Sequence, residues 1–219
     1  MKQPDFERAK QYALARLENE LDPRLSYHSL AHTRDDVVPA VSRLALLAGV
    51  SPAERLLLET AALYHDIGFI VARLGHESIS ARIAAATLPD FGFSQSQVGT
   101  INDLILATKV PQSPQTFLGA LLCDADLDSL GREDFFTLSG RLHRELGAYS
   151  QPLTAAEWYA TQLHFLQSHT YLTPAAAQLR NAGKQKNIAA VKKRLEKLSG
   201  SPCRSSWNST MASAATSQP

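Results

Sequence analysis

The sequence has few of the features that mark secreted, membrane-spanning or β-rich proteins. Its 219 residues include only two cysteines, Cys123 after an apolar run and Cys203 in a polar tail. A structural disulfide is therefore not expected, and a reducing cytoplasm fits this use of cysteine. The N-terminus lacks an apolar signal region, and no stretch approaches the ~20 apolar residues of a membrane span. These absences predict a cytoplasmic protein with no membrane partner.

The sequence also has no large excess of charge of one sign. It holds 22 Lys and Arg against 21 Asp and Glu, for a net charge of +1, so overall charge makes nucleic acid an unlikely partner. Residues 180–204 depart from this balance, with eight basic residues against one acidic. Apolar residues recur at helical spacing within this stretch, so most of its charges are expected on the exposed face of an amphipathic helix. A phosphate-rich partner is the alternative.

No stretch alternates apolar and polar residues as a half-buried strand would, and the periodicity is helical almost throughout. We therefore expect an all-α protein folded as a single helical bundle. Capping boxes at Ser51–Glu54 and Thr154–Glu157 mark two helix starts, and Gly68 is expected to end the first of these helices. The predicted helices cover residues 6–21, 29–47 with a kink at Pro39, 51–68, 76–88, 94–109, 115–130, 133–146, 154–169 and 173–198, with Gly183 as a candidate break in the last.

The chain is expected to contain one domain. Residues 1–24 should form an N-terminal helix that packs on it, and residues 25–198 should form the domain with a C-terminal helical extension. Residues 199–219 are mostly Ser, Ala, Thr and Pro, which supply few core side chains. This tail is therefore predicted to be disordered.

Four potential metal ligands follow one another as His32, the pair His65-Asp66, and Asp126. Imidazole nitrogens and carboxylate oxygens without thiolates suit a divalent ion such as Mn²⁺, Mg²⁺, Fe²⁺, Co²⁺ or Zn²⁺. The short connection at residues 48–50 makes two predicted helices antiparallel, which brings His32 near His65 and Asp66. Asp126 must arrive through tertiary packing. A metal held by these side chains could activate water for hydrolysis.

Each of these residues also has a structural interpretation. A single histidine in a helix is more often a hydrogen-bonded core residue, and Asp66 could be a turn residue. Asp124, Asp126 and Asp128 could share a solvated helix face, yet the first two follow an apolar run, where buried carboxylates need partners. Taken together in this order, the four favour metal binding, with Asp124 as the alternative to Asp126.

Three sequence stretches carry a resemblance to a known family. They are residues 27–33 (YHSLAHT), 63–68 (LYHDIG) and 123–127 (CDADL), and together they resemble the HD superfamily of metal-dependent phosphohydrolases over roughly residues 25–195. Residues 131–136 (GREDFF) and 183–187 (GKQKN) are similar to a bacterial subgroup of predicted phosphohydrolases. The resemblance implies an HD-domain helical bundle. It also implies hydrolysis of a phosphoester in a nucleotide or another small phosphorylated metabolite.

Carried over residue by residue, the resemblance makes His32, His65, Asp66 and Asp126 the metal ligands. It also implies that His28 donates a proton to the leaving group. Asp66, as a ligand beside the metal-bound water, could orient or deprotonate that water. His28 lies four residues before His32, so the spacing predicts that both share one helix face; orienting its neighbour is the alternative role for His28. The candidate contacts to the substrate phosphate are His76, Lys109 and Arg34.

One difference from the family limits which of its specific activities the resemblance implies. Members that act on the alarmone pyrophosphate or on deoxynucleotide monophosphates often have acidic residues shortly after the HD pair, whereas residues 67–72 here are IGFIVA. Two other functions are compatible with these residues. The first is a di-iron oxygenase that uses His28 and His76 as extra ligands. The second is a non-catalytic, metal-stabilised signalling module.

Overall fold

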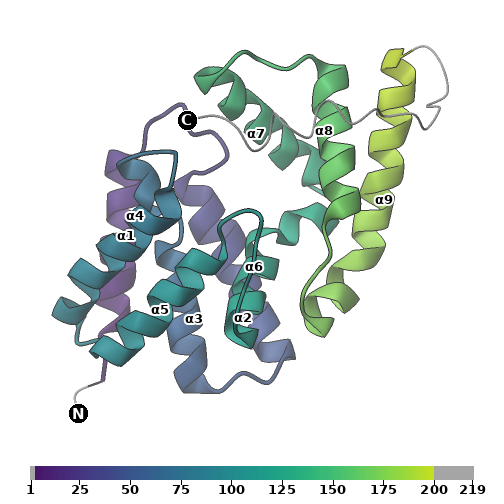
Figure 1. Ribbon diagram of the computed structural model, residues 1–219. Coiled ribbons are helices and arrows are strands. Elements are labelled where there is room, and N and C mark those ends of the chain that lie inside the picture. The colour runs from purple at the N-terminus through teal and green to yellow at the C-terminus, as the bar shows by residue number, and fades with distance from the viewer. Residues whose placement is uncertain (1–2, 200–219) are drawn as a thin grey trace.

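The chain is all-α, as the sequence predicts, in a computed structural model that describes residues 3–199 (Figure 1). No strand occurs within that range. A π-helical segment, η1 (His32–Val37), precedes the second helix, and the 3₁₀ helices are η2 (Ile67–Ile70), η3 (Leu88–Phe91) and η4 (Asp128–Gly131). The α-helices are α1 (Phe6–Glu20), α2 (Val38–Leu47), α3 (Pro52–Tyr64), α4 (His76–Thr87), α5 (Gln95–Ala107), α6 (Phe117–Asp126), α7 (Phe135–Tyr149), α8 (Ala155–Ser168) and α9 (Pro174–Ser199).

Local capping explains where several of these helices begin. Both predicted capping boxes are present, because Ser51 accepts a hydrogen bond from the Glu54 amide and Thr154 accepts one from the Glu157 amide. In each box the glutamate side chain also accepts from the backbone of the capping residue. Reciprocal bonds of this kind satisfy amides that have no partner inside the helix.

The irregularity expected near Pro39 takes the form of the π-helix η1. Pro39 lies in the first turn of α2 and has no amide hydrogen to donate. The Val38 amide, directly before it, bonds to the Thr33 carbonyl, five residues back. π-Helical turns are rare and frequent at functional sites, and this one begins at His32.

Apolar packing divides into two clusters. The larger one is built from α1 to α6 with the start of α9, and it buries Ala9, Ala13 and Leu17 of α1 completely or almost so. The smaller cluster joins α7, α8 and α9 around Phe135, Leu166 and other side chains; in Figure 1 these three helices lie together on one side of the molecule. The predicted boundaries at residues 24 and 198 stay predictions. Residues 200–219 of the predicted tail lie outside the described range.

Two predictions about glycines were wrong, for one physical reason. The third helix ends at Tyr64 rather than at Gly68, and α9 continues through Gly183 without a break. A Cβ at Gly68 would lie 2.1 Å from the His76 carbonyl oxygen, and a Cβ at Gly183 would lie 2.0 Å from the Gly131 carbonyl oxygen. These glycines allow two backbone segments to touch and do not end helices.

The predicted helix over residues 115–130 is also divided. α6 ends at Asp126, and η4 follows as a separate 3₁₀ turn. The Leu127 amide, between them, bonds to the Cys123 carbonyl, and its backbone leaves the helical region with ψ near 15°. This break places Asp126 at a helix end, where its side chain can reach across to other elements.

The basic stretch of α9 is largely an exposed helix face, as the amphipathic interpretation predicts. Lys192, Lys193, Arg194 and Lys197 are exposed. Two basic residues depart from this pattern: Lys184 is 5% exposed and donates to the His169 carbonyl oxygen at 2.6 Å, at the end of α8, and the Arg180 side chain is 18% exposed and pairs with Asp128 at 2.7 Å. Separately, no helix among the described residues has the length and apolar character needed to cross a membrane.

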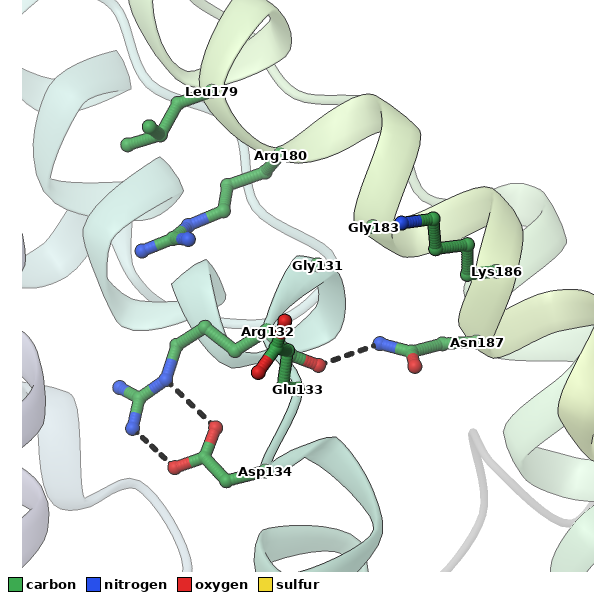
Figure 2. A pocket seen from close by; sticks show the side chains of 9 residues that line it. All are labelled: Gly131, Arg132, Glu133, Asp134, Leu179, Arg180, Gly183, Lys186 and Asn187. Carbon is green, nitrogen blue, oxygen red and sulfur yellow. Dashed lines mark hydrogen bonds and ion pairs between the residues drawn. The ribbon is translucent and has the colours of Figure 1, made fainter.

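The two stretches that resemble the bacterial subgroup meet in space. Residues from 131–134 and 183–187 line one surface pocket of about 540 Å³ (Figure 2). Across it, the Asn187 side chain donates to the carbonyls of Leu130 and Arg132, both at 2.9 Å. The Arg132 guanidinium also donates to Asp36 of η1 at 2.6 Å. These contacts fasten η4 and α9 to the segment that carries His32.

Candidate metal centre

Four side chains from three parts of the chain converge in the interior. His32 begins η1, His65 caps the end of α3 with Asp66 next to it, and Asp126 is the last residue of α6. The ligand atoms of His32, His65 and Asp66 all lie within 4.8 Å of one another, and these residues are 5%, 1% and 5% exposed. The Asp126 side chain is 18% exposed.

The carboxylates lie between the two imidazoles. Asp126 Oδ1 is 3.2 Å from His32 Nε2 and 3.5 Å from His65 Nε2. Asp66 Oδ2 is 3.6 Å from His32 Nε2 and 3.3 Å from His65 Nε2. The ligand atoms of His32, His65 and Asp66 are therefore close enough together to reach a common ion, and Asp126 lies against both imidazoles beside them.

Two ligand atoms of this cluster have no hydrogen-bond partner among the described residues. His65 Nδ1 lies 2.7 Å from the Ala62 carbonyl oxygen, so Nδ1 carries a proton and Nε2 is the ring atom directed towards the carboxylates. His65 Nε2 and Asp66 Oδ2 are both buried without a hydrogen-bond partner in the described part of the chain. Burying such groups unsatisfied costs about 1–3 kcal/mol each. This donor set fits a divalent metal ion, which would bind both atoms.

The charges of the cluster stabilise one another. Burial lowers the pKa of His65, but the Asp66 and Asp126 carboxylates outweigh it, so the pKa lies well above its usual range. For Asp66, burial raises the pKa, and the neighbouring histidines, His65 first, outweigh it and bring the pKa below its usual range. The pKa of Asp126 is lowered in the same way, mainly by its bonds to His32 and His65. Metal binding at Nε2 would displace a proton from His65.

Asp124, the alternative last ligand, has a different role. Its carboxylate accepts hydrogen bonds from the amides of Leu172 and Thr173, both at 2.8 Å, and from the Thr173 hydroxyl at 2.7 Å. It therefore holds the chain at the start of α9, while Asp126 is the residue that faces the histidines. Two positions further along a helix is a rotation of about 200°, so the two side chains cannot share a face.

His28 is not on the helix that carries His32, contrary to the prediction from their spacing. It lies in a bend, and the helical segment begins only at Leu30. The two rings are nevertheless close, with centroids 6.0 Å apart. Because the backbone is not helical at residue 28, its orientation depends on a contact from a distant part of the chain.

That contact comes from Glu145 of α7, whose side chain is 1% exposed. One carboxylate oxygen accepts from the amides of Tyr27 and His28, at 2.7 and 3.0 Å, and the other bonds to His28 Nδ1. Burial lowers the pKa of His28, but the bond to Glu145 and the charge of Asp66 outweigh it and raise the pKa. Sequence reasoning missed Glu145, because one acidic residue in an amphipathic helix gives no signal of a partner 117 positions away.

His76 also lies beside the cluster. Its Nδ1 is 3.1 Å from the Arg73 carbonyl oxygen, and its Nε2 is 3.5 Å from Asp66 Oδ1. Phe69 stacks between His76 and His28, with ring centroids 3.9 and 4.4 Å apart. The Phe69 ring thus packs against both His28 and His76. It holds them next to the four central residues of the cluster, which are His32, His65, Asp66 and Asp126.

The other two predicted phosphate contacts are not brought to the cluster. Arg34 is exposed and pairs with Asp35 at 2.8 Å. Lys109 is exposed beyond the end of α5. Within residues 3–199, neither side chain forms a hydrogen bond or an ion pair with the four central residues. Their assignment as substrate contacts stays a prediction from the resemblance.

Comparison with known proteins gives no family assignment. No protein-family model matches the sequence, and no curated protein matches it. The HD superfamily stays a resemblance carried by residues 27–33, 63–68 and 123–127.

Proposed function

We propose that the protein is a cytoplasmic, metal-dependent phosphohydrolase that cleaves a phosphoester of a nucleotide or another small phosphorylated metabolite. The main support is the buried His32, His65, Asp66 and Asp126 cluster, in which two ligand atoms have no hydrogen-bond partner among the described residues. These four side chains would hold the ion. When bound, a divalent ion lowers the pKa of water and neutralises charge on phosphoryl oxygens.

Asp66 is the proposed acceptor of the water proton. Its Oδ2 makes no hydrogen bond within the described residues, and its Oδ1 faces His76 at 3.5 Å. Its lowered pKa keeps the carboxylate ionised. An ionised, buried carboxylate can orient a water molecule and take up its proton as the oxygen attacks phosphorus.

His28 is the proposed proton donor to the leaving oxygen. Glu145 occupies its Nδ1, so Nε2 is the atom that would give up the proton. The raised pKa favours the protonated ring near neutral pH, and a carboxylate on the far nitrogen stabilises that charge, as in other acid–base pairs. In this proposal Glu145 positions His28 and does not touch the substrate.

Replacing Glu145 with glutamine is expected to lower kcat about 10–100-fold and to change its pH dependence. The carboxylate raises the pKa of His28, so its loss lowers that pKa. His28 then loses its proton at a lower pH than in the wild-type protein. The alkaline limb of the kcat profile should therefore move to lower pH. Initial rates measured between pH 5 and 10, a range that brackets the usual pKa of histidine at about 6.5, test this.

The matched control is Glu133→Gln, at an exposed position. It should leave both kcat and the pH profile unchanged. A Glu145→Gln protein that loses stability without any shift of the alkaline limb would show that Glu145 is only a structural residue. An unchanged rate would exclude His28 and Glu145 from the reaction.

A di-iron oxygenase is the second candidate, and the position of His76 favours it. Like His65, His76 has Nδ1 near a backbone carbonyl and Nε2 facing Asp66, as expected of a further metal ligand. Iron close to two atoms per chain, together with oxygen consumption, would support this function. A protein that binds metal but is catalytically silent would favour the signalling module.

Phosphate release from a panel of nucleotides and phosphorylated metabolites tests the proposed function. Reactions contain Mn²⁺, Mg²⁺ or Co²⁺, or a chelator. We expect turnover that requires metal and that is lost in a His65→Ala/Asp66→Ala protein that still folds. Turnover that survives chelation and both substitutions would contradict the proposal.

A further inference from the structure

A pair of arginines on one tyrosine ring lies at the edge of the metal centre. The guanidinium carbon of Arg24 is 4.6 Å from the centroid of the Tyr149 ring, and that of Arg73 is 4.8 Å from it. The two arginines come from different connections, between α1 and η1 and between η2 and α4. Tyr149 is the last residue of α7. Three distant parts of the chain therefore meet at this ring.

A closed chain of contacts joins this ring to the metal centre. Tyr149 lies one helical turn, about 6 Å, after Glu145, and Glu145 bonds to His28. On the other side, the Arg73 carbonyl accepts from His76, whose Nε2 faces Asp66. Phe69, stacked between His28 and His76, completes the chain of contacts. The arginine pair is thus connected to the proposed proton donor through Tyr149 and Glu145 on one side and through His76 and Phe69 on the other.

The two arginines differ in how their charge is balanced. Arg24 is paired with Asp22, to which its Nε and Nη2 both donate. Arg73 forms no ion pair and no side-chain hydrogen bond with any residue in the range 3–199. The Glu145 carboxylate on the same face of α7 is occupied by His28 and by two amides. The Arg73 guanidinium is therefore oriented by its contact with the Tyr149 ring, and its N–H donors have no acceptor within residues 3–199.

We propose that Arg73 binds a second oxyanion group of the substrate, remote from the phosphoester that is cleaved. A stacked guanidinium loses little further freedom when it binds, and its fork of donors matches phosphate and carboxylate. The inference rests on the proposed function, because the metal centre supplies the anchor for the first phosphate. It defines the substrate class as a small molecule with two separated anionic groups.

The proposal is tested with ligands that cannot be hydrolysed. Alkane bisphosphonates of increasing chain length are compared with alkyl phosphonates of the same length, and with phosphonates that end in a carboxylate. Binding to the Mn²⁺-loaded full-length protein is measured by titration calorimetry. We expect at least one two-headed ligand to bind about tenfold or more tightly than its one-headed match. The two kinds of second group distinguish phosphate from carboxylate recognition.

Arg73→Ala should reduce that advantage to about twofold or less, and Arg73→Lys, which keeps the charge without the fork, should give an intermediate value. Arg82→Ala on α4, an exposed arginine, is the matched control and should keep the full advantage. The advantage is the ratio of the affinities for the two-headed and the one-headed ligand, both measured on the same protein. A lower metal affinity or a smaller folded fraction affects both ligands equally and leaves this ratio unchanged.

The inference is overturned if no chain length gives an advantage, if neither kind of ligand binds, or if the advantage persists in Arg73→Ala. Failure of the proposed function has a different signature. In that case the phosphate-release panel is silent while the two-headed ligands still bind through Arg73.

Discussion

Replacing Asp66 with asparagine is expected to abolish metal-dependent phosphate release, with kcat falling about 10³-fold or more. The Asp66 carboxylate lies 3.3–3.6 Å from nitrogen atoms of His32, His65 and His76. Among the described residues, no other acidic side chain is paired with all three histidines. Asparagine keeps the shape of the side chain but removes its negative charge. The variant therefore loses both a metal ligand and the acceptor of the water proton.

The control for this variant is Asp103→Asn, at an exposed position of α5. Both proteins are compared with wild type by initial rates across a range of Mn²⁺ concentrations and by thermal melting. Asp103→Asn should match wild type. An Asp66→Asn protein that keeps metal-dependent turnover within a few-fold of wild type would contradict the role given to this carboxylate.

Replacing Gly183 with alanine is expected to destabilise the protein by about 3 kcal/mol, at the upper end of the usual cost of overpacking. The new Cβ would lie 2.0 Å from the Gly131 carbonyl oxygen, so α9 and η4 must separate. For a protein of this size the loss corresponds to a fall in Tm of about 6–12 °C. Unfolding by urea, followed by circular dichroism, measures the free energy directly.

The sign of this effect separates close packing from helix propensity. In a helix free of such contacts, glycine to alanine stabilises by up to ~1 kcal/mol. Gly140 in α7 provides that comparison, because a Cβ there would meet no atom within 4 Å. Gly140→Ala should therefore be neutral or stabilising. A Gly183→Ala protein that is as stable as wild type, or more stable, would contradict the contact between α9 and η4.

Helix starts were predictable because their determinants are local. The capping boxes at Ser51 and Thr154 use residues three positions apart, and both are present in the structure. The glycines at 68 and 183 were misinterpreted because their partners, the carbonyls of His76 and Gly131, lie elsewhere along the chain. A glycine that allows close approach looks the same in a sequence as one that ends a helix.

The candidate site shows the same distinction between residues with local signals and residues whose partners lie far away in the sequence. The sequence order placed His32, His65, Asp66 and Asp126 in one constellation, and the structure brings these four together. It favoured Asp126 but left Asp124 as the alternative, because that choice depends on which helix face meets the histidines. Glu145 and Arg73 carried no signal, since their roles arise only when α7 packs against two loops.

The most direct test of the metal centre is a calorimetric titration of chelator-treated protein with Mn²⁺. Repeating it in buffers of different ionisation enthalpy measures how many protons are released on binding. We expect saturable binding of at least one ion per chain, with proton release, because His65 Nε2 must lose its proton to bind metal. His65→Ala should abolish this binding, whereas His164→Ala, at an exposed position of α8, should preserve it. The absence of saturable binding, or equal binding by His65→Ala, would contradict a metal centre at this cluster.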